Sequence, residues 1–92
     1  MYEGNGKTFA KWALESQNFY IRASMAMSIV IASRTDDAAL TLCLRDWYMP
    51  TPEVSAEKTE VLRQVILKNQ DFLPSVVLLG AIEKKCGKFP VR

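Results

Sequence analysis

Polar residues recur every three or four positions near the start of the chain, which is the period of one face of an α-helix. The set is Lys7, Lys11, Glu15, Asn18 and Arg22. The apolar residues fall mainly elsewhere on the helical wheel, as a buried stripe does, and they are Phe9, Trp12, Ala13, Phe19, Tyr20 and Ala23. We therefore expect a first helix from residue 8 to about residue 22.

The segment from Ala23 to Ser33 has no charged residue and no polar face. A helix here would be buried on most sides, and its Ala and Ser residues would let a neighbouring helix approach closely. The competing interpretation is a strand at 28–32, because Ile29-Val30-Ile31 is β-branched. We favour the helix, since no glycine or proline occurs between Lys7 and Met49 to separate this segment from the first helix.

Polar residues at 34–37 mark the next boundary. Thr35 or Asp36 can cap the following helix, and Asp36 and Asp37 place negative charge at its N-terminus. A second helix is expected over 36–48, ended by Pro50. Its apolar residues recur at three- and four-residue steps, and they are Leu40, Cys43, Leu44 and Trp47.

Thr51-Pro52-Glu53 is the clearest helix start in the chain, with Thr51 as N-cap and Pro52 in the first helical position. The third helix continues to about Gln70. A fourth apolar segment, 76–82, ends in lysines and Gly87, which is typical of a helix C-terminus. Gly80 leaves a strand at 76–80 as an alternative. The fold class expected is all-α, a small four-helix domain, with α+β and short strands near 28–32 and 76–80 as the alternative.

Composition indicates one globular domain spanning 1–92. Apolar residues make up 49% and charged residues 24% of the 92 residues. Residues 1–6 are expected to be a flexible N-terminus and residues 88–92 a short basic tail. A chain this small and this apolar often gains further burial by self-association, so we expect a homodimer. The net charge of +2 is too small to imply a nucleic-acid or membrane partner by itself.

Histidine is absent, which excludes Ser-His-Asp and Cys-His catalysis and most zinc sites. The spacing of Cys43 and Cys86 is no disulfide framework, and two cysteines alone do not make a structural metal site. The polar stretch from Met1 to Lys7 does not resemble a signal peptide, and the longest uncharged run is too short to span a bilayer. We expect a cytoplasmic protein with reduced thiols, no metal, no cofactor and no enzymatic activity.

The segment from Gly4 to Thr8 ends in the Gly-Lys-Thr of a phosphate-binding loop. That motif needs a glycine five residues before Gly6, where this chain has Met1, and a preceding strand. We therefore interpret it as a polar lead into the first helix. Cys86 lies among lysines that would lower the pKa of its thiol, so a reactive thiol is a minor alternative.

The last turn of the second helix carries the candidate partner-binding residues, which are Arg45, Trp47, Tyr48 and Met49. Trp, Tyr and Arg are enriched at interface hot spots. Three consecutive large side chains cannot all face one core, so at least one should be exposed or lie at an interface. The alternative, weighed equally, is a corner plug that covers the end of the bundle.

The C-terminal segment offers a second candidate surface, formed by Lys84, Lys85, Lys88 and Arg92. These cations could contact nucleic-acid phosphates, although a solvated helix end that complements the helix dipole explains them as well. We expect a small helical interaction protein (an adaptor, inhibitor, chaperone or regulatory subunit) that binds a protein partner. A nucleic-acid-binding regulator is the alternative.

Overall fold

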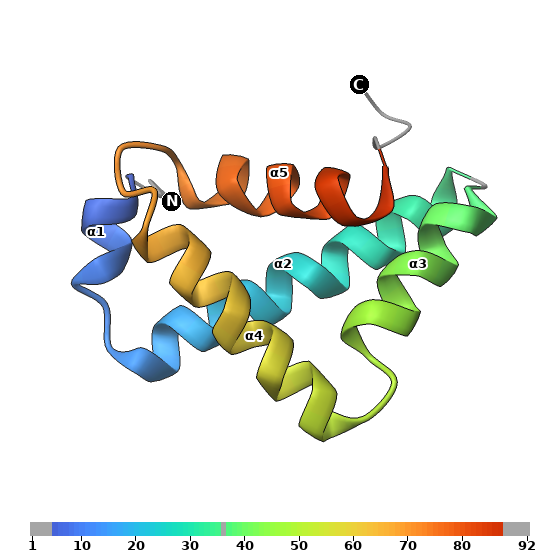
Figure 1. Ribbon diagram of the computed structural model, residues 1–92, viewed down its shortest axis with the longest axis horizontal. Helices are drawn as coiled ribbons and strands as arrows, with labels where there is room; N and C mark the ends of the chain where they lie inside the picture. The colour runs from blue at the N-terminus through green and yellow to red at the C-terminus, as the bar shows by residue number, and fades with distance from the viewer. Residues whose placement is uncertain (1–4, 36, 88–92) are drawn as a thin grey trace.

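The computed structural model describes residues 5–35 and 37–87. Its helices are α1 (Gly6–Ala10), α2 (Leu14–Arg34), α3 (Ala38–Tyr48), α4 (Pro52–Leu67) and α5 (Pro74–Cys86). The described residues contain no strand, so the all-α prediction is confirmed and the α+β alternative is wrong (Figure 1). Residues 28–32 lie in α2 and residues 76–80 lie in α5. The predicted basic tail, the first four residues of the predicted N-terminal segment, and Asp36 lie outside the described residues.

The helices meet in a single core. α2 packs against α3 and α4, α4 also packs against α1 and α5, and α3 contacts α5. Figure 1 shows α4 crossing α2 and α5 lying along the upper edge of the molecule. The buried apolar side chains come from all five helices, and they are Phe9, Ile21, Met25, Ala32, Leu40, Leu44, Tyr48, Leu62, Ile66, Leu78 and Ile82.

Capping residues set the boundaries of the middle helices. Asp37, rather than the predicted Thr35 or Asp36, is the N-cap of α3, and its Oδ1 accepts from the backbone N–H of Leu40 at 2.9 Å. Thr35 instead closes α2, because its hydroxyl donates to backbone carbonyls of the last turn. Thr51 caps α4 as predicted, accepting from the N–H of Val54 at 3.1 Å.

The predicted helix over 8–22 is interrupted, because the chain leaves α1 at Ala10 and starts α2 at Leu14. The side chain of Gln17 holds this break in place. It is only 4% exposed, and its Nε2 donates to the carbonyl oxygens of Phe9 at 2.9 Å and Trp12 at 3.2 Å. A side chain that lies eight residues after Phe9 and five after Trp12 thus bonds carbonyls that a continuous helix would have bonded itself.

The start of α1 is held by Asn5 and Gly6. Asn5 Oδ1 accepts from the backbone N–H groups of Lys7 and Thr8, and the N–H of Gly6 donates to the carbonyl of Phe72 at 2.9 Å. A Cβ on Gly6 would lie 2.5 Å from Cα of Gln70. The Gly-Lys-Thr residues therefore form a capped helix start packed against the α4–α5 connection.

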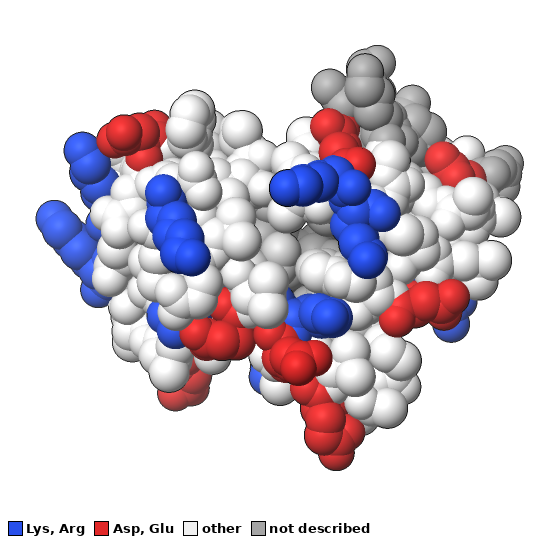
Figure 2. All heavy atoms as spheres, in the orientation of Figure 1, with Lys and Arg blue, Asp and Glu red and all other residues white. Residues whose placement is uncertain are grey.

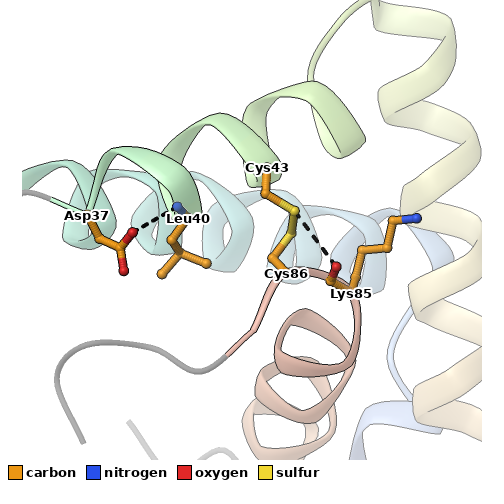
Figure 3. The surroundings of a disulfide bond; sticks show 5 residues. All are labelled: Asp37, Leu40, Cys43, Lys85 and Cys86. Carbon is orange, nitrogen blue, oxygen red and sulfur yellow. Dashed lines mark hydrogen bonds between the residues drawn. A yellow bond between two sulfur atoms is a disulfide. The ribbon is translucent and has the colours of Figure 1, made fainter.

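A disulfide joins Cys43 in the middle of α3 to Cys86 at the end of α5, with the two Cα atoms 5.8 Å apart (Figure 3). The expectation of reduced thiols is therefore wrong, and so is the alternative of a reactive Cys86. Cys43 Sγ also lies 3.8 Å from the carbonyl oxygen of Lys85. We treat this as a van der Waals contact, because a disulfide sulfur has no hydrogen to donate.

Candidate protein-interaction surface

Tyr48, one of the four predicted partner-binding residues, belongs to the core. Its side chain is 2% exposed, and its hydroxyl lies 2.6 Å from Oγ1 of Thr59. The hydroxyl of Thr59 donates to the carbonyl of Ser55 at 2.7 Å, so the Tyr48 hydroxyl is the donor in the shorter bond. The ring of Tyr48 therefore joins α3 to α4 and is not available to a partner.

The other three predicted residues lie around the same corner of the molecule. Trp47 is half-buried against the core, and Nζ of Lys58 lies 5.5 Å from the centroid of its ring, a cation–π distance. Arg45 and Met49 are exposed, Met49 by 53%. The pair Trp47–Tyr48 thus acts mainly as the corner plug, and only Arg45 and Met49 offer fully exposed contacts.

The basic C-terminal segment is partly outside the described residues. Lys84 and Lys85 are exposed in the last turn of α5, where cations complement the helix dipole. Lys88 and Arg92 are not among the described residues. Figure 2 shows a small group of basic side chains over the end of α5 beside acidic ones, while other basic side chains lie apart from it and acidic side chains gather along the lower edge, over α4. This face therefore presents mixed charge.

The largest unpredicted feature is an exposed apolar row on α2. Phe19 is 72% exposed, Met27 60% and Val30 49%, and Ala23 between them is exposed as well. Steps of four, four and three residues place these side chains on one face of the helix. We call this row, Phe19, Ala23, Met27 and Val30, the α2 stripe.

The α2 stripe lies on the side of the helix roughly opposite to its buried face. That buried face carries Gln17, Ile21, Met25 and Ala32. The sequence predicts a helix covered on most sides over 23–33, yet the neighbouring helices cover only one side of it. The other side is as apolar as a buried face and is open to solvent.

A wide-open groove of about 1400 Å³ lies along α2, and all of its lining residues belong to the segment 12–27. It extends from Trp12 to Met27, so Phe19 lies near its middle. Oδ1 of Asn18, which lines the groove, is buried without a hydrogen-bond partner in the described part of the chain. A buried acceptor without a donor lowers the stability of the fold.

Charged residues flank Phe19 on the same face. Glu15 precedes it by four residues and Arg22 follows it by three, and both are exposed groove residues. The ion pairs found among the described residues are Lys7–Asp71 and Glu60–Arg63, so neither Glu15 nor Arg22 takes part in one. The stripe therefore has an acidic and a basic residue beside its largest side chain.

A polar network behind the groove fixes the start of α2. Arg63 donates from Nη1 to Oε1 of Gln17 at 3.2 Å and from Nη2 to Oε2 of Glu60 at 2.7 Å. The hydrogen bond from Arg63, followed by that from Gln64, lowers the pKa of the Glu60 carboxyl, and the same bond raises the pKa of Arg63. The carboxylate therefore stabilises the fold above its usual pKa, and this contribution is lost as the pH falls through the lowered value.

A second exposed apolar group lies before and along α5, and it consists of Phe72, Leu73, Val76 and Leu79. No buried polar side-chain atom without a hydrogen-bond partner occurs beside it in the described residues, so we rank it below the α2 stripe.

Sequence reasoning missed Phe19 because it assigned this residue to a helix that began at residue 8. The ring cluster of Phe9, Trp12 and Tyr20, with centroids 5.3 to 5.9 Å apart, forms across the break and leaves Phe19 outside. The apolar segment 23–33, which has no polar face, could have pointed to Met27 and Val30, but it does not include Phe19.

None of the helices in residues 5–35 and 37–87 is long and apolar enough to cross a membrane. Within the same residues, no group of three or more Cys, Asp or Glu side chains could hold a metal ion. No family model, no curated protein and no solved structure matches this chain.

Proposed function

We propose that this chain is a small helical interaction domain that binds a protein partner through the α2 stripe and acts by binding rather than by catalysis. The observation that carries the proposal is the exposure of Phe19, Met27 and Val30 in one row. Contiguous exposed apolar patches bordered by polar residues are characteristic of protein contact sites. Whether the domain serves as an adaptor, inhibitor, chaperone or regulatory subunit depends on the partner.

The α2 stripe supports this proposal better than the corner predicted from sequence. At the corner, Trp47 and Tyr48 are committed to the fold, which leaves two exposed side chains on either side of a half-buried ring. On α2, the stripe adjoins an open groove with Phe19 near its middle. Burial of an exposed Phe or Met side chain contributes about 1.5–3 kcal/mol.

The compartment is part of the proposal. The prediction of a cytoplasmic location depended on reduced thiols, whereas disulfides persist mainly in oxidising compartments. The Cys43–Cys86 bond therefore supports an oxidising compartment, where disulfides persist, as the place where the protein acts. Alkylation of the protein as it is isolated from its own cells, followed by mass spectrometry, reports whether the two thiols are bonded there.

Affinity capture with matched phenylalanine variants tests the proposed function. The immobilised wild-type domain is compared with Phe19→Asp and with Phe72→Asp, which makes the same change at a 56% exposed phenylalanine away from α2. We expect the proteins captured by wild type to be retained by Phe72→Asp and lost by Phe19→Asp. Equal capture by Phe19→Asp, with its helical circular dichroism spectrum and melting temperature intact, would contradict the proposal.

A further inference from the structure

We propose that the occupant of the α2 stripe is a second copy of this chain, docked antiparallel about a two-fold axis that passes beside Phe19. This inference rests on the proposed function and names the partner for the same surface. A two-fold interface is self-complementary, so that when residue i contacts residue j, residue j also contacts residue i. The surface of α2 around Phe19 meets this condition in charge.

The charge pattern sets the register. Glu15, Phe19 and Arg22 project within about 60° of one another around the helix, so they share one face. The midpoint between Glu15 and Arg22 lies next to Phe19. When two such helices cross antiparallel at that midpoint, each Glu15 faces Arg22 of the other copy. One axis thus forms two equivalent ion pairs from residues that have no ion pair within residues 5–35 and 37–87 of their own chain.

The groove provides the space for the apolar contact. It runs about equally far before and after Phe19, from Trp12 to Met27. A two-fold axis beside Phe19 therefore brings the two phenylalanine rings together, and each ring lies against groove residues of the other copy. The small side chain of Ala23 lets the α2 helix of the second copy approach closely. The Ala and Ser residues of 23–33 predict such an approach by a neighbouring helix. The exposed ion pairs contribute mainly orientation and specificity, and the apolar groove contributes most of the affinity.

Charge reversal tests the register without disturbing the core, because both side chains are exposed. Glu15→Arg places like charges opposite each other twice in a homodimer, and so does Arg22→Glu. We expect each variant to weaken dimerisation about tenfold in sedimentation equilibrium. An equimolar mixture of the two variants forms opposite pairs at both positions, so heterodimers should return to the wild-type affinity. Native mass spectrometry distinguishes them, because the heterodimer and the two homodimers differ in mass.

The control variants reverse charges at exposed positions away from α2. Arg45→Glu on α3 and Glu57→Arg on α4 should leave the dimer constant unchanged. A wild-type chain that stays monomeric, single variants that dimerise as wild type does, or a mixture that forms no heterodimer would each overturn the two-fold dimer. The proposed function falls separately, only if Phe19→Asp retains the captured partners.

Discussion

At the scale of single residues, two glycines that look alike in the sequence have opposite roles. Gly6 begins α1, and a Cβ there would lie 2.5 Å from the Cα of Gln70, which is a contact with backbone. Gly80 lies in the middle of α5, where a Cβ would meet nothing within 4 Å. The first glycine allows α1 to pack on the α4–α5 connection, and the second only weakens its helix.

The two alanine substitutions should therefore change stability in opposite directions. Gly6→Ala forces α1 away from Gln70, and we expect a loss of about 1–3 kcal/mol, which is the usual cost of overpacking. Gly80→Ala should gain about 0.5–1 kcal/mol, because alanine loses less backbone entropy in a helix. Urea unfolding followed by circular dichroism measures both. A Gly6→Ala variant as stable as wild type would show that the close approach is unimportant.

At the scale of helices, the least expected feature is a break made without glycine or proline. The long stretch without these residues correctly predicts helices, and Thr51-Pro52 correctly predicts the start of α4. The break at 11–13 depends on Gln17, which lies in α2. Its side chain donates back to the carbonyls of Phe9 and Trp12. Helical periodicity does not reveal such a contact between a side chain and the backbone of a preceding segment. The prediction of one continuous helix over 8–22 also hid the exposure of Phe19.

Removal of the Gln17 amide should be costly. Gln17→Leu keeps a side chain of similar size but removes the amide donor from the carbonyl of Trp12 and the second of two donors from that of Phe9, and it removes the acceptor of Arg63 Nη1. We expect about 2–3 kcal/mol of destabilisation, since an unsatisfied buried polar group costs about 1–3 kcal/mol.

The matched control is Gln64→Leu on α4. Gln64 is exposed, and within the described residues its side chain bonds Oε2 of Glu60, so a change within about 0.5 kcal/mol is expected. Equal unfolding midpoints for the Gln17 and Gln64 variants would argue against a structural role of the Gln17 amide.

At the scale of the whole molecule, the disulfide compensates for a small core. Domains of this size bury a modest fraction of their surface and are only marginally stable. The Cys43–Cys86 bond ties the end of α5 to α3 across a sequence separation of 43. Sequence could not reveal this pairing, because such a separation says nothing about the distance between the two residues in space.

Reduction should therefore lower stability while leaving the helices formed. A closed loop of this length contributes about 4 kcal/mol in the chain-entropy model, and native disulfides typically contribute about 2–4 kcal/mol. We expect a clear fall in melting temperature for the reduced protein and for the Cys43→Ser/Cys86→Ser variant. The double variant serves as the control, since its melting temperature must not respond to the reductant. An unchanged melting temperature of fully reduced wild type would contradict this role.

The α2 stripe is the feature that connects all three scales. Gln17 is buried at the start of α2, and this orientation of the helix places Phe19 on the outer side. α3 and α4 pack only against the opposite side of α2. Fold class and most helix boundaries follow from local pattern. The surface that remains open follows from how the helices are arranged, which is why the sequence pointed to the Arg45–Met49 corner instead.

The central claim, that the chain associates with itself through α2, is tested most directly by the methyl resonances of its methionines. Met27 lies on the stripe and Met49 at the corner, with exposed fractions of 60% and 53%. In a concentration series of protein labelled with ¹³C at the methionine methyls, the account predicts that the Met27 signal shifts as dimer forms while the Met49 signal stays in place. A Met27 signal that remains constant over the whole series, whether or not Met49 moves, would contradict it.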